Sequence, residues 1–458
     1  MLATIREALA GSQRDLTEGD PGRAIVFLAI PMILEMLMES LFGIVDMFFV
    51  ARLGVDSLAT VALTESVLVL VFGIAMGLSM ATTAFVARRI GEKDPEGAAL
   101  AAVQAIAVGL LLAILVGAAG ILFAPDLLRL MGATDAVVHT GTTYTRILLG
   151  GSVTIFLLFL INAIFRGAGD AAISMRALWI ANFINIVLDP CLINGWGPFP
   201  RLKVLGAAVA TTTGRGIGVS FQIWMLLGGY SRIRVHLRQI RINAKVMWQL
   251  LSVSFTGILQ EVIGSASWTG LIRICATFGS VPVAGYTVAL KMILFTILPM
   301  WGLSNAAATL VGQNLGAKKP DRAEAAVYKT GIYGTWYMGS VAVVFLLFAP
   351  QLAGFFTTDS AVRDAASTVL RCFSVGNVCY AWGMVLVQAF NGAGDTRTPM
   401  LINLCCYWGF QLPLAWTLAV LLHWGPMGIF AAVPATETLG TISSFILFRR
   451  GKWKLKVI

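Results

Sequence analysis

The chain has 458 residues, of which 58% are hydrophobic and only 12% are charged, and its formal net charge is +10. A mean hydropathy of +0.83 excludes a soluble globular protein and indicates a chain that crosses a bilayer many times. The basic residues lie in short segments between apolar stretches, so the positive charge reflects membrane topology. We therefore expect a lipid bilayer and no nucleic acid among the partners.

The first 23 residues are polar and mixed in charge, without the apolar core or the cleavage site of a signal peptide. We expect residues 1–23 to lie on the cytoplasmic surface as an amphipathic lead-in. The six cysteines and three histidines show no metal-ligand spacing. We therefore expect no metal and no cofactor other than a coupling ion.

Twelve apolar stretches follow, each long enough to cross a bilayer as a helix. Their approximate ranges are 24–50, 58–84, 98–123, 142–165, 174–194, 205–228, 246–276, 283–310, 327–350, 366–391, 399–422 and 427–448. The apolar runs are continuous instead of alternating, which argues against a barrel. The predicted fold class is an all-α polytopic membrane protein with twelve transmembrane helices.

The first span carries three carboxylates, Glu35, Glu39 and Asp46, in the otherwise apolar stretch 31–52. At about 100° per residue, steps of four and eleven bring them within roughly 40° of one another. A bare carboxylate at membrane depth costs about 3 kcal/mol or more, so this acidic stripe should face protein or water. Such a stripe, on a helix loosened by Pro31, suits a cation carrier. The alternative is a polar face satisfied by neighbouring helices.

The basic residues favour one orientation in the membrane. With the N-terminus inside, most of the 33 Lys and Arg residues fall in inner segments, and a minority, including Arg52 and Arg129, fall in outer ones. This excess places both termini in the cytoplasm. We expect a multi-pass protein of the inner (plasma) membrane.

The chain also repeats itself at an offset of 225 residues. Phe123–Pro125 recurs as Phe348–Pro350, and Gly167–Asp170 recurs as Gly392–Asp395. The offset spans six helices, an even number, so two halves of equal orientation should be related by an axis along the membrane normal. The predicted organisation is a lead-in (1–23), a first half (24–228), a basic cytoplasmic linker (229–245), a second half (246–448) and a basic tail (449–458).

Two further features concern this repeat. The Gly-Ala-Gly-Asp segments are predicted to be tight turns, with each aspartate capping the next helix. Glu65 in span 2 and Lys291 in span 8 occupy near-equivalent positions of the two halves. An ion pair between them would gate the seam; separate pairing within each half is the alternative.

Several short motifs lie in or between the spans. They are Pro31 with Val45–Asp46, Arg52–Gly54, Ala87–Lys93, Asn185–Pro190, Gly206–Thr211 and Val311–Gly316. With these motifs the chain resembles the multidrug and toxic compound extrusion (MATE) family over about residues 24–448, closer to its DinF-like branch. The resemblance implies a V-shaped carrier that exports organic cations in exchange for protons or sodium ions.

The resemblance also implies roles for individual residues. Asp46 matches the first-span aspartate of the family, which implies a role in binding the coupling ion or the substrate. Asn185 and Asp189 match a pair in span 5 of the DinF-like branch, and Thr211 matches a polar residue in span 6. Together they would form a polar pocket in the first half. The alternative for Asp189 is a helix-end residue before Pro190.

Glu261 in span 7 lies close to a glutamate of the sodium-coupled branch, whose span 10 also carries an aspartate. The comparable position here is Tyr380, which puts a sodium site in the second half in doubt and favours proton coupling. The candidate binding residues are Asp46, Glu35, Glu39, Asn185, Asp189, Thr211 and Glu261.

The sequence thus predicts a monomeric secondary active antiporter for a small cationic or amphipathic substrate. A flippase for lipids or lipid-linked precursors is the main alternative, but it should have more spans and a basic cavity. An intramembrane enzyme would need a nucleophile with a base or a metal motif, and neither is present in the sequence. A channel would be passive, so uphill efflux separates it from a carrier.

Overall fold

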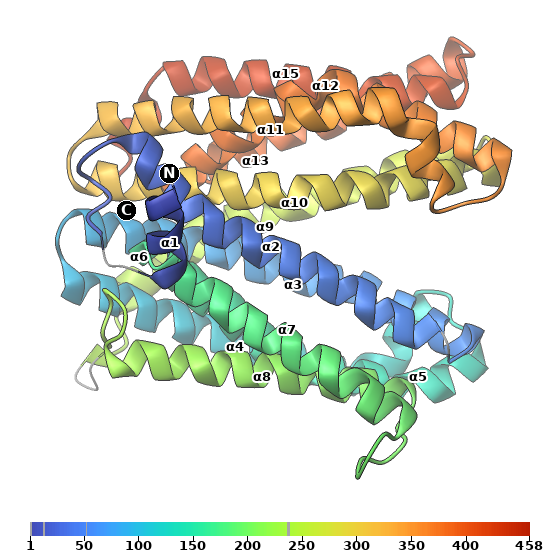
Figure 1. The fold of residues 1–458 in the computed structure, drawn as a ribbon, viewed down its shortest axis with the longest axis horizontal. Helices are drawn as coiled ribbons and strands as arrows, with labels where there is room; N and C mark the ends of the chain where they lie inside the picture. The colour runs from blue at the N-terminus through green and yellow to red at the C-terminus, as the bar shows by residue number, and fades with distance from the viewer. Residues whose placement is uncertain (1, 12–13, 52, 236–238) are drawn as a thin grey trace.

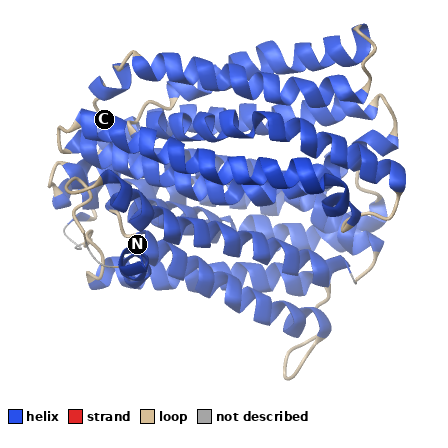
Figure 2. Cartoon of the chain, turned by 45° about the horizontal axis from the view of Figure 1, so that its top comes forward, coloured by secondary structure: helices blue, strands red, loops and turns tan. Residues whose placement is uncertain are grey.

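The computed structural model describes residues 2–11, 14–51, 53–235 and 239–458. Arg52, which the sequence analysis placed in an outer loop, lies outside these residues, as does part of the linker. Within the described ranges the chain consists of helices and connecting loops, with no strand. Most helices run along one common direction, and the loops between them are mostly short (Figures 1 and 2).

The first half holds six spans. After the lead-in helix α1 (Leu2–Ala10), these are α2 (Pro21–Ala51), α3 (Val55–Gly91), α4 (Pro95–Leu130), the pair α5 (Asp135–Gly150) and α6 (Ser152–Ala168), α7 (Ala171–Asn194) and α8 (Val204–Gly228). The predicted fourth span is therefore broken at Gly151. Here the hydroxyls of Ser152 and Thr154 donate hydrogen bonds to the carbonyls of Leu149 and Gly151, respectively, and so satisfy backbone acceptors at the break.

The second half also holds six spans. Its spans are α9 (Ala244–Ala276), α10 (Ser280–Gly316), α11 (Pro320–Gly354), α12 (Ser360–Gly392), a composite eleventh span and α15 (Pro426–Arg449). The eleventh span alternates α13 (Arg397–Asn403), η2 (Leu404–Gln411), α14 (Leu412–Trp416) and η3 (Thr417–Leu421), where η2 and η3 are π-helical. A short 3₁₀ turn, η4 (Lys452–Leu455), follows.

The predicted twelve spans are confirmed, and among the described residues eleven are long and apolar enough to cross a membrane. The twelfth, α8, is less apolar because it carries three consecutive threonines (211–213) and, after Gly214, Arg215. Several helices extend well beyond their predicted ends, notably α3 and α10. Their C-terminal ends stay helical because each packs against the other half.

The first two spans of each half pack against the first two spans of the other half. The N-terminal part of α2 packs on α10, where Ile25, Leu28 and Met32 join the apolar core of the second half. In the repeat-related contact, α9 packs on α3, and Leu250 of α9 joins a core cluster of the first half. The halves meet near both chain termini and diverge toward the opposite end (Figure 1). The predicted V shape is confirmed.

Glycines allow the closest approach between the halves. A Cβ atom on Gly91 would lie 2.0 Å from the carbonyl oxygen of Gln313, and one on Gly316 would lie 2.1 Å from that of Arg88. Real Cβ atoms do not come this close to backbone oxygens, so only glycine fits at these two repeat-related positions. The C-terminal ends of α3 and α10 therefore touch backbone to backbone.

The repeated turns form as predicted, with Gly169 and Gly394 at φ of 90° and 80°. The predicted cap by Asp170 is wrong, because its side chain makes no bond to the start of α7. Asp170 instead accepts hydrogen bonds from Ser231 Oγ at 2.5 Å and from the Arg232 amide at 2.8 Å. Burial raises the pKa of Asp170, and these bonds act against that rise. Asp170 thereby holds the start of the linker against the first half.

Candidate functional site

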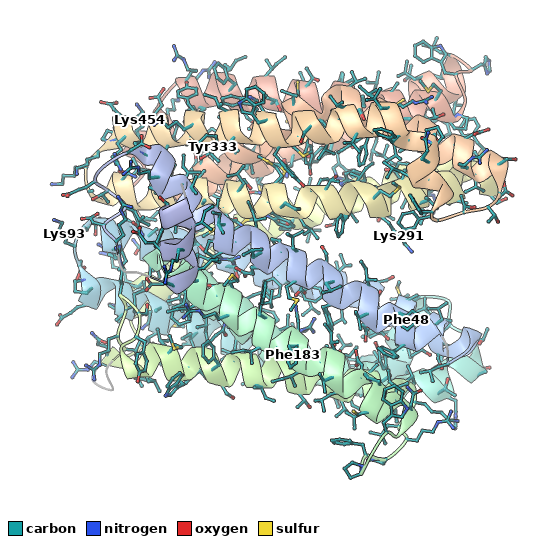
Figure 3. All side chains as sticks on the ribbon, viewed as in Figure 1. Phe48, Lys93, Phe183, Lys291, Tyr333 and Lys454 are labelled. Carbon is teal, nitrogen blue, oxygen red and sulfur yellow. The ribbon has the colours of Figure 1, made fainter. Side chains whose placement is uncertain are left out.

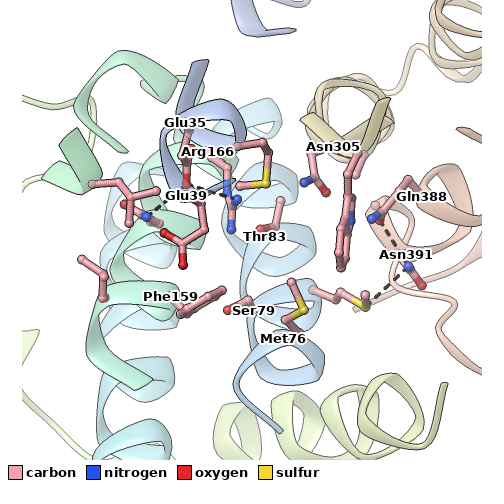
Figure 4. A pocket seen from close by; sticks show the side chains of 18 residues that line it. Glu35, Glu39, Met76, Ser79, Thr83, Phe159, Arg166, Asn305, Gln388 and Asn391 are labelled. Carbon is pink, nitrogen blue, oxygen red and sulfur yellow. Dashed lines mark hydrogen bonds and ion pairs between the residues drawn. The ribbon is translucent and has the colours of Figure 1, made fainter. Parts of the chain in front are cut away.

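A polar cavity with an empty volume of about 750 Å³ lies between the two halves. On one side it is lined by Glu35 and Glu39 of α2 and by Arg166 of α6. Asn305 of α10 and Gln388 and Asn391 of α12 line the other side, as Figure 4 shows. Both halves thus contribute polar side chains to one space, which is the arrangement expected for a carrier that binds substrate at its seam.

Glu35 is held by two residues of α6. Asn162 Nδ2 donates to Glu35 Oε1 at 3.1 Å, and Arg166 Nη1 lies 3.6 Å from the same oxygen. Gln222 Nε2 in turn donates to Asn162 Oδ1 at 2.6 Å, which fixes the orientation of that amide. Glu35 is 2% exposed, and its second oxygen has no partner within the described part of the chain. One carboxylate oxygen is therefore left to bind a proton or a cation.

Glu39 lies one turn further along α2 and lines the same cavity. Asn182 Nδ2 of α7 donates to Glu39 Oε2 at 3.3 Å. The predicted acidic stripe therefore faces protein and the cavity, as expected. Arg166 lies in the last turn of α6 and balances the charge of Glu35.

The Glu35–Arg166 pair predicts a measurable stability effect. Replacing Arg166 by Met should lower the free energy of unfolding by about 3–5 kcal/mol, because it leaves a buried carboxylate without its cation. The double variant Glu35→Gln/Arg166→Met should recover most of that loss. Reversible denaturant unfolding in detergent measures both. The control is Arg129→Met, since Arg129 and Asp126 form an exposed pair at 3.2 Å that should contribute at most about 1 kcal/mol. Equal losses in the single and double variants would contradict the pairing.

A second acidic group lies further along α2, at Asp46. The residue is 9% exposed, and its Oδ1 atom has no hydrogen-bond partner among the described residues. Arg215 of α8 is near enough for its charge to act on Asp46, although the two form no ion pair within 4 Å there. The Arg215 guanidinium instead lies over the rings of Phe42 and Phe72, at 5.9 and 5.5 Å from their centroids. Asp46 is thus a charge without a fixed partner.

The structure brings three predicted residues of α7 and α8 together beside Asp46. Asn185 Nδ2 donates to Thr211 Oγ1 at 3.1 Å and to Asp189 Oδ1 at 3.4 Å. Asp189 is fully buried, its Oδ2 atom has no partner among the described residues, and the charge of Asp46 acts on it. Because α7 continues past Pro190 to Asn194, Asp189 does not end the helix. These residues therefore lie together as a polar cluster in the first half.

The remaining predicted residues lie elsewhere. Lys291 projects from α10 toward the first half (Figure 3), and its charge acts on Glu65. The described residues show no ion pair within 4 Å for these two, so the gate stays a prediction. Glu261 lies in a separate cavity of the second half, beside Tyr380. Glu437 in α15 accepts a hydrogen bond from Tyr407 at 3.4 Å.

Two helical halves with a polar cavity between them, and with incompletely paired carboxylates at membrane depth, define a multi-pass membrane transporter. The MatE family model matches residues 31–191 and 255–417 of the chain. The chain therefore belongs to the MatE family, as its motifs indicated. The two matched segments fall in the two halves, in agreement with the internal repeat.

Known proteins resemble the chain over nearly its full length. It is 24% identical to the "Probable multidrug resistance protein YoeA" of Bacillus subtilis, over 95% of each chain. It is 25% identical to the "FAD transporter" of Shewanella oneidensis, over 94% of each chain. A solved "Outward-facing conformation of a multidrug resistance MATE family transporter of the MOP superfamily" matches with a TM-score of 0.89 and 28% identity, over 96% of this chain and 98% of the other.

Proposed function

We propose that the chain is a secondary active antiporter that exports organic cations from the cytoplasm in exchange for protons. The observation that carries this proposal is the set of buried carboxylates in the first half, of which Glu35, Asp46 and Asp189 each keep one oxygen unpaired among the described residues. Its similarity to proteins named for multidrug resistance supports the choice of cargo. The protein would act as a monomer in the inner (plasma) membrane, with both termini cytoplasmic.

The mechanism is competition for negative charge. An ionised Asp46 attracts a cationic substrate, whereas a proton that arrives from outside neutralises the carboxylate and removes that attraction. Asp189 sits in the same cluster, so a proton can be shared between two carboxylates that repel each other. The inward proton gradient then drives the release of substrate to the outside.

Proton coupling is favoured over sodium coupling by the composition of the two halves. The first-half cluster of Asn185, Asp189 and Thr211 is assembled, whereas Tyr380 stands where a second-half sodium site would place a carboxylate. Transport of a fluorescent organic cation into inverted vesicles tests this directly. A proton gradient alone should drive uptake and a sodium gradient alone should not. If neither a proton gradient nor a sodium gradient drives uptake, the antiporter proposal is overturned.

The flippase remains the alternative function. It would need a basic cavity for phosphate groups, and the similarity to a protein named FAD transporter gives that idea some support. However, the cavity between the halves combines Glu35 and Glu39 with a single described basic residue, Arg166. The acidic excess suits a cation better.

Alternating access requires that one side be closed while the other is open, and the N-terminal lead-in supports closure on the cytoplasmic side. Arg322 of α11 donates to the carbonyls of Glu18 and Gly19 at 2.7 and 2.5 Å. Lys329 pairs with Asp20 at 2.5 Å, and its hydrogen bond lowers the pKa of that carboxyl. Arg176 of α7 meanwhile donates to two carbonyls of α1. The lead-in thus joins the two halves.

The C-terminal tail makes a similar connection. Lys456 Nζ lies 3.3 Å from Asp395 in the second half, while its carbonyl accepts a hydrogen bond from Arg88 of α3 in the first half. Trp453 anchors the tail, since it is 1% exposed and stacks on Phe448 at 4.7 Å. The contacts of both chain ends therefore bridge the two halves on the cytoplasmic side, and these contacts must break when that side opens.

Replacing Arg322 by Ala should shift the protein toward the state that is open to the cytoplasm. The variant loses hydrogen bonds between α11 and the lead-in, each contributing about 1 kcal/mol, so the population should change several-fold. Spin labels on Glu96 and Asp321 report the separation of the two halves by pulsed electron resonance. The control is Lys318→Ala, whose side chain makes no ion pair within the described residues. Identical distance distributions in both variants would show that the contacts between Arg322 and the lead-in do not favour the closed state.

A further inference from the structure

A cavity with an empty volume of about 560 Å³ lies at the end of the molecule where the two halves touch. None of its described lining residues also lines the cavity between the halves. Four segments border it: the lead-in with Asp15, the end of α3 with Gly91, the linker with Arg232, and α10 with Gln313. Lys93, which follows α3, lines it as well and lies at this end of the molecule (Figure 3). Both halves, the lead-in and the linker therefore meet around one space.

Two of the sequence motifs described above meet at this cavity. Gly91 and Lys93 belong to Ala87–Lys93, and Gln313 lies within Val311–Gly316. None of the candidate binding residues of the transport mechanism belongs to either motif. Their polar side chains are therefore free to serve another role.

The charged groups around the cavity are close to one another but unpaired. The charges of Arg232 and Lys93 both act on Asp15, yet the described residues show no ion pair within 4 Å for any of the three. Burial acts to raise the pKa of Asp15, but hydrogen bonds from Thr17 and these two positive charges outweigh it, so the pKa is lowered. Two cations and one carboxylate thus surround the space, which suits a ligand with an excess of negative charge.

Gln313 gives an independent indication of a ligand. It is 0% exposed, and its Nε2 atom donates to the Gly167 carbonyl at 2.9 Å, which fixes the amide. Its Oε1 atom accepts no hydrogen bond from any described residue. A buried acceptor without a partner destabilises a protein, and a ligand that donates a hydrogen bond removes that cost. The ligand should therefore carry an N–H or O–H donor besides its negative charge.

The side chains of Arg232 and Gln313 converge beside the tight turn at Gly169. A Cβ atom on Gly169 would lie 3.3 Å from Gln313 Nε2 and 3.8 Å from Arg232 Nη1. The backbone amide of Arg232 is held by Asp170 at 2.8 Å, whereas its guanidinium forms no hydrogen bond with a described residue. Arg232 is thus positioned through its backbone, and its guanidinium remains available to an anion.

The repeat-related position in the second half is filled by the chain itself. There the tail residue Ile458 packs against Gly394, with its Cγ2 atom 2.6 Å from a Cβ atom placed on that glycine. Arg88 is the repeat-related counterpart of Gln313, and it donates to the carbonyl of Lys456 in the same tail. One of two equivalent spaces is therefore occupied by the tail, whereas the other leaves a cavity with unpaired polar groups.

We propose that this cavity binds a small phosphate ester that also carries an amine. Arg232 and Lys93 bind the phosphate, because guanidinium and ammonium groups form strong charge-assisted hydrogen bonds with it. Asp15 and Gln313 bind the amine, because an ammonium group offers three donors to a carboxylate and an unpaired amide oxygen. Soluble phosphoamines and the headgroup of an aminophospholipid share this chemistry.

Such a ligand would regulate transport. It contacts Lys93 in the first half, Gln313 in the second half and Asp15 in the lead-in, so it stabilises the state in which this end is closed. Because alternating access requires this end to open in every cycle, the ligand slows the cycle. This consequence rests on the proposed function, whereas binding itself does not.

Binding is tested by isothermal titration of the purified full-length protein with two probes, O-phosphoethanolamine and dihexanoyl phosphatidylethanolamine. At least one should bind saturably, with about one molecule per chain, and Lys93→Gln and Arg232→Gln should each weaken it about tenfold. The control is Lys318→Gln, since Lys318 has the same φ of 58° and is the repeat-related lysine, but it does not line the cavity. Binding of neither probe overturns the site, as does an equal loss in the control.

The chemistry and source of the ligand are separated by competition. Inorganic phosphate alone and ethanolamine alone should each compete at least about tenfold more weakly than the probe that binds. Competition by phosphate at the same concentration as the probe would contradict the role of Asp15 and Gln313. Binding of only the short-chain lipid identifies a membrane lipid as the source, and binding of only O-phosphoethanolamine identifies a soluble one.

Regulation is tested in inverted vesicles, whose outer medium meets the face assigned to the cytoplasm. The probe that binds, added to that medium, should slow wild-type uptake of a fluorescent cation several-fold, and about tenfold more of it should be needed with Lys93→Gln. Unchanged uptake despite binding overturns the regulatory role and leaves both the site and the antiporter standing. Binding without any gradient-driven uptake in the wild type overturns the proposed function and leaves the site.

Discussion

Replacing Asp46 by Asn should reduce proton-driven efflux of organic cations by about ten- to a hundredfold. The substitution keeps the size of the side chain but removes the charge at Asp46 for which cargo and proton compete. A lost charge-assisted interaction corresponds to about 1.5–3 kcal/mol, which gives the expected range. Uptake of a fluorescent cation into inverted vesicles, with equal amounts of transporter, measures the effect.

The control for this experiment is Asp126→Asn. Asp126 is an exposed acid of the same half, paired among the described residues with Arg129, and its loss should leave efflux unchanged. If Asp46→Asn transports as well as the control, Asp46 has no part in coupling. The mechanism would then have to rest on Glu35 or Asp189.

Replacing Gly316 by Val should abolish most transport, with a loss of more than about tenfold. The added Cβ would lie 2.1 Å from the Arg88 carbonyl oxygen, so α3 and α10 would have to separate at the point where the halves close. The cytoplasmic side would then remain partly open, and cargo could not be released outward. Transport assays together with alkylation of a cysteine introduced at Ser79 would measure both consequences.

Gly339 offers the matched comparison. It also lies within a long helix of the second half, but a Cβ atom there would meet nothing within 4 Å. Gly339→Val should therefore transport normally and remain closed. Full activity in Gly316→Val would show that the backbone contact at the seam is not required for closure.

Much of the architecture could be predicted from the sequence because hydropathy acts over whole helices. The twelve spans and the two halves follow from continuous apolar stretches and from an offset repeat. Helix ends were less predictable, since α3 and α10 are extended by contacts with the other half, and no local pattern reports such contacts. The π-helical turns of the eleventh span, and the break at Gly151, were missed for the same reason.

The first-half site was found in part because unpaired acids in apolar helices are rare. Asp46, Asn185, Asp189 and Thr211 indeed cluster. The basic neighbour of Glu35, Arg166, was not identified from the sequence. Its pairing with Glu35 depends on how α6 packs against α2. Glu437 and Tyr407 come from spans that only the fold brings together.

In the proposed mechanism, Asp46 exchanges cargo for a proton during each cycle. The gate predicted between Glu65 and Lys291 would add a second role for charge. Its closing would bring together two groups whose charges already interact without forming a pair.

The most direct test of the central claim counts the protons released when a cation binds. Purified wild-type protein in weakly buffered detergent solution, mixed with tetraphenylphosphonium near neutral pH, should release protons that a pH-sensitive dye detects. Asp46→Asn should release about one proton fewer per chain, because binding there no longer displaces a proton. If the variant binds the cation and releases as many protons as the wild type, cargo and proton do not share Asp46.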